Sequence, residues 1–393
     1  MPWQEVSAMS LRQEFTLMAS KEGANVRELC RRYGISPPTG YKWLYRFWHA
    51  GVEGLREGSR RPHQSPGRTP PALEAAVLRV REAHPVWGGR KIRARLLHLG
   101  NPQVPSPSTI TAILHRHGCI DPAESAKRPH WQRFENPVPN GLWQMDFKGH
   151  FALLRGRCHP LTVLDDHSRF ALGLEACADE RGLTVRERLT TIFRRYGLPQ
   201  RMVMDNGAPW GADAAHPHTP LTVWLMHLGI RVSHGRPYHP QTQGKDERFH
   251  RTLRAELLQG KVFADLGTSQ RAFDRWRSVY NVERPHQALG LATPASRYAP
   301  SPRSFPESLP PVTYGDGDIV RRVVAGGIVN FKGHPFRISM AFRGHPVAFR
   351  PTATDGVWNI WFMTHRVAQV DLRGPRPLVE RIVESVNHVS EHV

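Results

Sequence analysis

The chain has 393 residues, and Lys plus Arg outnumber Asp plus Glu by 54 to 34, which gives a formal net charge of +20. This length exceeds what one hydrophobic core usually supports, so several domains are expected. The positive excess indicates a polyanionic partner, although a merely basic soluble protein has the same composition. The four cysteines include no CxxC pair and no stretch approaches 18 uninterrupted apolar residues, which argues against a zinc ribbon, a disulfide framework or a membrane span. We expect a cytoplasmic protein.

The first part of the chain is predicted to be helical. A helix over 11–20 is followed by a capping box from Asn25 to Glu28, and a further helix begins after Ser36 and ends at Gly51. This spacing suits a helix-turn-helix, whose second helix enters the major groove of DNA, but a plain helical hairpin is the alternative. The candidate DNA contacts on that second helix are Thr39, Tyr41, Lys42 and Arg46.

A second helical unit follows a basic linker rich in Arg, Pro and Gly. Helices over 72–83 and 89–99, and one from about Ser106 to Gly118, are predicted to form another helix-turn-helix. Residues 1–135 carry 21 Lys or Arg against 11 Asp or Glu, half of the whole excess, as expected for an arm that reads DNA. Further candidate DNA contacts are Arg60 and Arg61 in the linker, and Arg90 and Lys91 in the second unit.

From residue 140 onward, β-rich and amphipathic segments alternate. LWQMDF, CHPLTVLDD and RFALGLEA are predicted strands, and TVRERLTTIFRRYG is a predicted helix that leads into the strand RMVM. A helix over 219–228, a strand near IRVS, and helices over 243–258 and 269–281 complete an α/β domain with a mixed sheet. Short strands with Gly-containing turns over 312–372 predict a small β-barrel or sandwich.

Three carboxylates in this α/β region are candidates for binding divalent metal ions. Asp146 lies inside an apolar strand, where an unpaired carboxylate is costly. Asp205 ends the strand RMVM, and Glu247 lies on the flank of a helix whose apolar stripe includes the position of Asp246. Asp205 has the alternative role of a turn former, and Glu247 that of a solvated residue paired with Arg251. The adjacent Asp165 and Asp166 are predicted to build a hairpin turn.

Five motifs occur together: WQMDF, LTVLDDHSRF, MDNGAPW, HPQTQGKDERFHRTL and YNVERPHQALG with TPASRY. They resemble the integrase-core transposases of bacterial insertion sequences, relatives of retroviral integrases, over about residues 136–300. The resemblance implies a ribonuclease H-like fold and a catalytic triad of metal ligands at Asp146, Asp205 and Glu247, with Mg²⁺ or Mn²⁺, about two ions per site, as cofactor. It also implies a homo-oligomer on DNA. The spacing between Asp205 and Glu247 is longer than usual for the family, and WGADAAHPHTP is the expected inserted loop.

The resemblance predicts a DNA transposase that cleaves transposon ends and joins the freed 3′-hydroxyl to double-stranded target DNA. A catalytically decayed DNA-binding regulator and a nuclease that cleaves without joining are the alternatives. Near the triad, the candidate DNA contacts are Lys245, Arg251 and Arg254. The expected organisation is a helix-turn-helix domain over 1–60, a linker over 61–71, a second helix-turn-helix domain over 72–125, the catalytic core over 136–300, a Pro-rich linker over 301–311, a β-barrel over 312–375 and a tail over 376–393.

Overall fold

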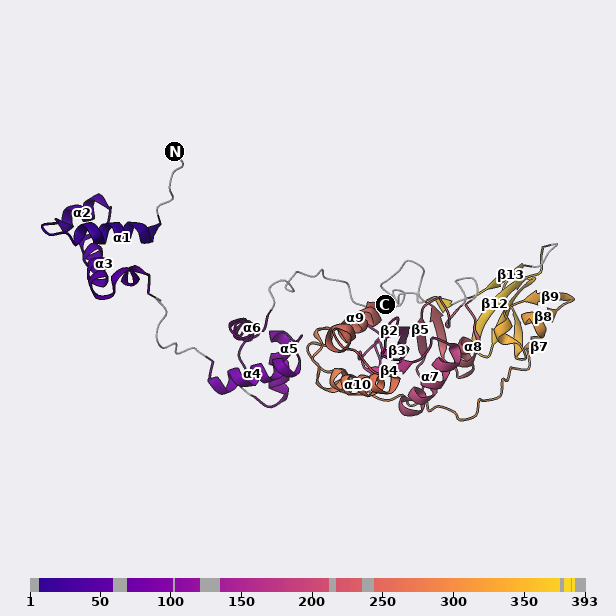
Figure 1. Cartoon of the computed structure of the whole chain (residues 1–393). Coiled ribbons are helices and arrows are strands. Elements are labelled where there is room, and N and C mark those ends of the chain that lie inside the picture. Colours follow the sequence, from indigo (N-terminus) through magenta and orange to yellow (C-terminus); the bar gives the residue numbers. More distant parts are fainter. Residues whose placement is uncertain are drawn as a thin grey trace. The chain divides into compact units, whose positions relative to one another are not determined.

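The computed structural model describes residues 7–58, 69–101, 103–120, 135–211, 217–234, 244–374, 378–382 and 384–385. The chain divides into two compact units, residues 1–68 and 69–393 (Figure 1). The predicted DNA contacts Arg60 and Arg61 lie outside the described residues. None of the helices in those ranges has the length and hydropathy of a transmembrane segment.

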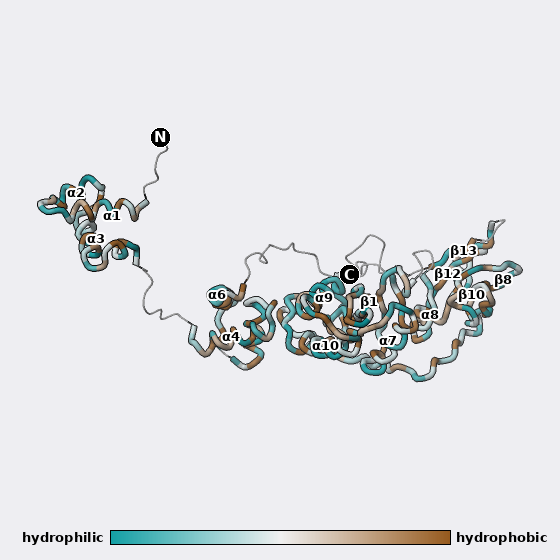
Figure 2. The backbone as a smooth tube through the Cα atoms, viewed as in Figure 1, coloured by the Kyte–Doolittle hydropathy of each residue, from teal (hydrophilic) through white to brown (hydrophobic). Residues whose placement is uncertain are grey.

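The first unit is a bundle of three helices, α1 (Ala8–Ala19), α2 (Val26–Arg32) and α3 (Pro37–Ala50), followed by a short 3-10 helix. The Asn25 side chain accepts a hydrogen bond from the backbone N–H of Glu28, which confirms one half of the predicted capping box of α2. The Glu28 carboxylate pairs instead with Arg31 at 2.9 Å. Phe15, Cys30 and Leu44 form the buried centre. The helices thus have one apolar side each, and Figure 2 shows apolar and hydrophilic stretches interleaved along them.

The second unit begins with three further helices, α4 (Pro71–Ala83), α5 (Gly89–His98) and α6 (Pro107–Arg116). Their shared core contains Val77, Trp87 and Ile92 among its buried residues. Glu74, which is nearly buried on α4, accepts hydrogen bonds from Arg116 at 2.6 Å and contacts His117 at 2.7 Å. These interactions hold the end of α6 against α4, so the predicted second helical unit has its own core and its own polar tie.

A mixed sheet forms the centre of the second unit. Its strands are β1 (Trp143–Phe147), β2 (Phe151–Ala152), β3 (Arg157–Asp165), β4 (Ala171–Cys177), β5 (Arg201–Met204), β6 (Arg231–His234) and β14 (Glu384–Ser385). Strands β1, β3 and β4 are antiparallel neighbours, whereas β5 pairs parallel with β1, and β6 pairs parallel with β5. The order β4-β3-β1-β5-β6 is that of the expected ribonuclease H-like core. The two-residue β2 is too short for a sequence pattern to predict it.

Helices cover both faces of this sheet. The helices α7 (Gly182–Tyr196) and α8 (Pro220–His227) share one hydrophobic core with β1 and β3. The helices α9 (Gly244–Leu253) and α10 (Leu266–Ser278) share a second core with alternate residues of β3 and β4. Each of the latter two continues into a π-helical turn, so the long predicted helix over 243–258 is interrupted at Arg254.

The C-terminal strands form a β-rich region, as expected. The strands are β7 (Ile319–Arg322), β8 (Ile328–Phe331), β9 (His334–Arg337), β10 (Pro346–Pro351), β11 (Val357–Phe362), β12 (His365–Asp371) and β13 (Leu378–Arg381). Five of them pair in the order β13-β12-β11-β10-β7, and β8 and β9 form a separate hairpin. The ring of His227 on α8 packs edge-on against Phe362. The apolar core is therefore continuous from α8 into these strands.

Candidate active site

Asp146 lies on the α9 side of β1. Its cross-strand partner on β3 is Thr162, and partners in an antiparallel pair lie on the same face of the sheet. The Thr162 hydroxyl donates a hydrogen bond of 2.9 Å to the backbone carbonyl of Asp146. The Asp146 side chain keeps 26% of its surface exposed, so the carboxylate is mostly withdrawn from water but still accessible to a ligand.

Asp205 follows directly after β5, the parallel neighbour of β1, and is exposed. One of its carboxylate oxygens accepts a 2.7 Å hydrogen bond from the backbone N–H of Asn206, which agrees with the turn-forming alternative. Its backbone carbonyl contacts Nδ1 of His234 at 2.9 Å, which ties this turn to the end of β6. The two roles are compatible, because the exposed side chain remains free to share an oxygen with a cation.

Glu247 lies on the exposed side of α9, whereas its neighbour Asp246 is fully buried beside Phe249. The helical wheel predicted this division between the two carboxylates. No ion pair joins Glu247 to Arg251 in the part of the chain that the structure describes. Both carboxylate oxygens of Asp246 lack a hydrogen-bond partner among these residues, and burial raises its pKa well above the ordinary value, with Asp146 and Asp166 adding to the effect.

Two carboxylates of the predicted triad act electrostatically on the third, Asp146. The pKa of Asp146 is raised to about 7. Burial is the main cause, and the negative charges of Asp205, Glu180 and Glu247 contribute to the increase. Among the described residues, no three His, Cys, Asp or Glu side chains are arranged closely enough to hold a metal ion. The donor set nevertheless fits Mg²⁺ or Mn²⁺, which prefer carboxylate oxygens, because a cation among these groups would offset their repulsion.

Two residues near Asp146 were not singled out from the sequence. Glu180 precedes α7, and its carboxylate contacts Nδ1 of His159 at 2.9 Å. His250 lies on α9 with its Nδ1 4.0 Å from the Asp146 carboxylate and its Nε2 2.9 Å from the Thr162 hydroxyl. The position of His250, three residues after Glu247 on a helix, is a signal that was present in the sequence. Nothing in the sequence placed Glu180 near β1.

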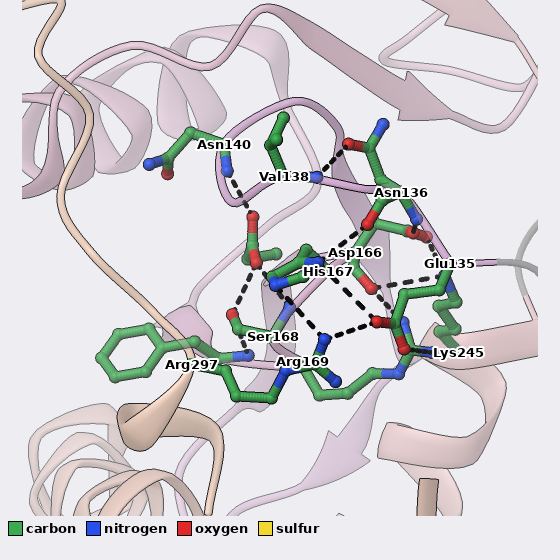
Figure 3. Close-up of polar contacts among 12 residues, drawn as sticks. Glu135, Asn136, Val138, Asn140, Asp166, His167, Ser168, Arg169, Lys245 and Arg297 are labelled. Carbon is green, nitrogen blue, oxygen red and sulfur yellow. Dashed lines mark hydrogen bonds and ion pairs between the residues drawn. The ribbon is translucent and has the colours of Figure 1, made fainter. Parts of the chain in front are cut away.

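The Asp165 and Asp166 pair builds the predicted turn between β3 and β4. Asp165 accepts hydrogen bonds from the backbone N–H groups of Ser168 and Asn140, each at 2.7 Å. Asp166 points into the protein, where Gln144 on β1 donates to it at 2.7 Å. Lys245 on α9 forms an ion pair with the same carboxylate (Figure 3). The turn therefore joins β1, β3 and the start of α9.

The predicted DNA contacts of the first unit lie on α3. Tyr41 and Lys42 are exposed, and the Arg46 guanidinium packs 5.1 Å from the ring centre of the buried Trp43. The Thr39 hydroxyl is hydrogen-bonded to that of Ser36, at the start of the helix. Phe47, on the same helix, is half-buried.

The remaining predicted DNA contacts differ in exposure. Arg90, Arg251 and Arg254 are exposed. Burial, assisted by the Arg284 guanidinium, lowers the pKa of Lys91 to about 8. Lys245 keeps only 17% of its side-chain surface exposed, because it is engaged with Asp166. The two lysines are thus packed against protein groups, whereas the arginines present open cationic surface.

Comparison with known families accounts for most of the chain. The sequence matches the Integrase core domain over residues 136–240 and again over 228–294, and the C-terminal domain of IS481 family transposases over 318–377. It also matches a Helix-turn-helix domain over 13–63 and a Homeodomain-like domain over 39–114. The chain therefore carries an integrase core, helix-turn-helix domains and a C-terminal domain like that of IS481 family transposases. DNA binding follows from the helix-turn-helix domains.

Relatives include proteins of insertion elements and of retroviruses. An uncharacterized 39.2 kDa protein of insertion element IS476 from Xanthomonas euvesicatoria is 26% identical over 62% of this chain and 69% of its own length. An uncharacterized 31.7 kDa protein of IS407 from Burkholderia multivorans is 29% identical over 40% of this chain and 55% of its own. The Gag-Pol polyprotein of feline leukemia virus is 28% identical over 30% of this chain and 7% of its own.

Solved structures of retroviral integrases are distant matches. The integrase catalytic core domain of HTLV-2 in complex with magnesium is 15% identical, with a TM-score of 0.33, over 42% of this chain and 100% of its own. The simian T-cell lymphotropic virus intasome, solved in complex with a regulatory subunit of PP2A, is 16% identical, with a TM-score of 0.35, over 78% of this chain and 96% of the matched chain.

Proposed function

We propose that the chain is an active DNA transposase that binds transposon ends, cleaves the phosphodiester bond there and joins the 3′-hydroxyl to target DNA. The observation that carries this proposal is that two carboxylates from other elements act electrostatically on Asp146. Asp146 on β1 has a raised pKa partly because Asp205, after β5, and Glu247, on α9, place negative charge near it. Carboxylates gathered in this way are costly for a folded protein unless they serve a cation.

The residues that would hold the metal are Asp146, Asp205 and Glu247. When bound, a pair of divalent ions supplies Lewis-acid stabilisation of the attacking and leaving oxygens of the phosphodiester. The mostly buried Asp146 supplies the fixed ligand on β1, whereas the exposed Asp205 and Glu247 have the freedom to close on the cation. The retained exposure of the latter two also leaves room for a phosphate to approach from solvent.

The protein holds DNA at surfaces of positive charge. On α9, Arg251 and Arg254 are exposed on the side of the helix that presents Glu247, and they are positioned to contact phosphates that flank the reacting bond. Exposed Tyr41 and Lys42 on α3 are candidates for reading the transposon end in the major groove. We also infer that the active form is a homo-oligomer assembled on two ends.

The test is an end-cleavage and strand-transfer assay on labelled oligonucleotides with Mg²⁺. Asp146→Asn, Asp205→Asn and Glu247→Gln are each expected to reduce both steps by about a thousandfold, because a lost ligand removes several kcal/mol of transition-state stabilisation. End binding, measured by gel shift, is expected to persist. Glu187→Gln, which changes an exposed carboxylate on α7, is the matched control and should retain activity.

Different failures point to different functions. Unchanged joining by the triad variants would refute the assignment of these residues. A wild-type chain that binds ends but shows no Mg²⁺-dependent nicking would instead be a decayed regulator. Nicked products without joined products would indicate a nuclease.

A further inference from the structure

Helix α9 is attached to the sheet by polar contacts on both sides of Glu247. Lys245, two residues before Glu247, forms an ion pair with the fully buried Asp166 at the end of β3. His250, three residues after Glu247, contacts the Thr162 hydroxyl in the middle of β3 at 2.9 Å. The apolar residues Phe249 and Leu253 are buried on the same helix, in the core that α9 shares with α10.

Both attachments continue through β3 to β1. Asp166 accepts a 2.7 Å hydrogen bond from the side chain of Gln144, and Thr162 donates one of 2.9 Å to the backbone carbonyl of Asp146. Gln144 and Asp146 are two residues apart on β1, so they lie on the same face of that strand. Two chains of contacts therefore run from α9 to adjacent positions of β1, with Glu247 between them.

The direction of the hydrogen bonds in the second chain is determined by its chemistry. A threonine hydroxyl has one proton, and here it is given to the Asp146 carbonyl. Nε2 of His250 therefore donates to the Thr162 hydroxyl, and Nδ1 of the same ring lies 4.0 Å from the Asp146 carboxylate. The imidazole thus acts as a spacer of defined length between α9 and the strand that carries Asp146.

We propose that these two relays, Lys245–Asp166–Gln144 and His250–Thr162–Asp146, position Glu247 against Asp146 for metal binding. The inference rests on the proposed function, since it concerns the ligands named there. Apolar contacts alone allow a helix to slide or rotate, because they are not directional. Two polar contacts, one before and one after Glu247 in the helix, fix the position of Glu247 along the helix axis and its rotation about that axis. Figure 3 shows Lys245 reaching the cluster around Asp166. Lys245 is accordingly a positioning residue.

The histidine relay is tested by titrating the full chain with Mn²⁺ alone and measuring free Mn²⁺ by electron paramagnetic resonance. His250→Phe is expected to weaken Mn²⁺ binding by about tenfold or more, the usual effect of removing a group that orients a ligand. His250→Gln should recover most of the affinity, because its amide N–H reaches the position of Nε2. His250→Asn, whose amide reaches only the position of Nδ1, should not. Equal affinity in the Gln and Asn variants, or wild-type affinity in the Phe variant, would overturn this relay.

The lysine relay is tested by Lys245→Met, Asp166→Asn and the double variant. Each single change is expected to weaken Mn²⁺ binding, and the second change should add little in the double variant because the two groups act as one unit. If Lys245→Met instead weakened DNA binding and left Mn²⁺ binding unchanged, Lys245 would be a DNA contact and this relay would be wrong.

A control separates positioning from general stability. Glu256, beyond the end of α9, forms a nearly buried ion pair of 2.9 Å with Arg284. Glu256→Gln should lower the melting temperature as the relay variants do, yet leave Mn²⁺ affinity unchanged. Asp146→Asn distinguishes an error in the proposed metal site from an error in the relays alone. If it titrated like wild type, the proposed metal site and the relays would both fall, whereas loss in Asp146→Asn with none in the relay variants would refute only the relays.

Discussion

His286 shows how a single buried side chain makes stability depend on pH. It is 8% exposed, and its Nε2 has no hydrogen-bond partner among the described residues. Burial lowers the pKa of His286 to about 2, and the charges of Arg284 and Lys91 contribute to the decrease. The imidazole is therefore neutral in the folded protein, whereas in the unfolded chain it takes up a proton below its ordinary pKa of 6.5.

The sign of the pH effect follows from this difference. Below pH 6.5 the unfolded state binds one more proton than the folded state, so the free energy of unfolding falls by up to about 1.4 kcal/mol for each pH unit. His286→Gln, which does not titrate, should flatten this dependence between pH 6.5 and 5. This pH dependence is measured by the hydrogen exchange of residues 279–290 in the wild type and the variant. Exposed His98→Gln is the matched control, and an equally flat profile there would contradict the assignment to His286.

At the scale of elements, the first unit depends on a close approach between helices. A Cβ added to Gly40 on α3 would lie 2.3 Å from the sulfur of Cys30 on α2 and 2.9 Å from the ring of Phe15 on α1. Alanine normally favours a helix by about 1 kcal/mol over glycine, but overpacking a core costs about 1–3 kcal/mol. We therefore expect Gly40→Ala to destabilise this unit by about 1 kcal/mol.

Hydrogen exchange of α1, α2 and α3 in the full chain is the measurement for Gly40→Ala. Gly182, the first residue of α7, offers a matched control, because a Cβ there would meet its nearest atoms at 3.9 Å, an ordinary contact. Gly182→Ala should leave the exchange of its own helix unchanged or slower. Slower exchange in Gly40→Ala would mean that the helices separate easily and that their spacing does not depend on glycine.

At the scale of the whole molecule, the charge of +20 predicts how DNA binding responds to salt. Each phosphate neutralised by Lys or Arg releases counterions, so the logarithm of affinity falls linearly with the logarithm of salt concentration. Residues 1–68 form a compact unit of their own, so a chain of residues 69–393 should fold without them. We expect it to bind transposon ends more weakly and with a shallower salt slope. Fluorescence anisotropy at several salt concentrations measures both, and an unchanged slope would show that the first unit makes no phosphate contacts.

The sequence determined the kinds of elements and the division of each helix into buried and exposed sides. The α9 segment is an example: its periodicity placed Asp246 inside and Glu247 outside, as the structure has them, because burial repeats every 3.6 residues along a helix. The cap at Asn25 was predictable for the same local reason. The family motifs added the candidate triad, whose convergence on a metal ion stays a prediction.

The tertiary structure alone decided which side chains from distant segments meet. Lys245, expected to face DNA, is paired with Asp166, which lies 79 residues earlier in the chain. His250 reaches Thr162 across 88 residues, and Glu180 acts on Asp146 from a separate loop. Such contacts depend on the order and register of strands, which non-local packing fixes and local patterns do not encode. For the same physical reason, the sequence predicted that Lys245 contacts DNA, whereas in the structure it pairs with the buried Asp166.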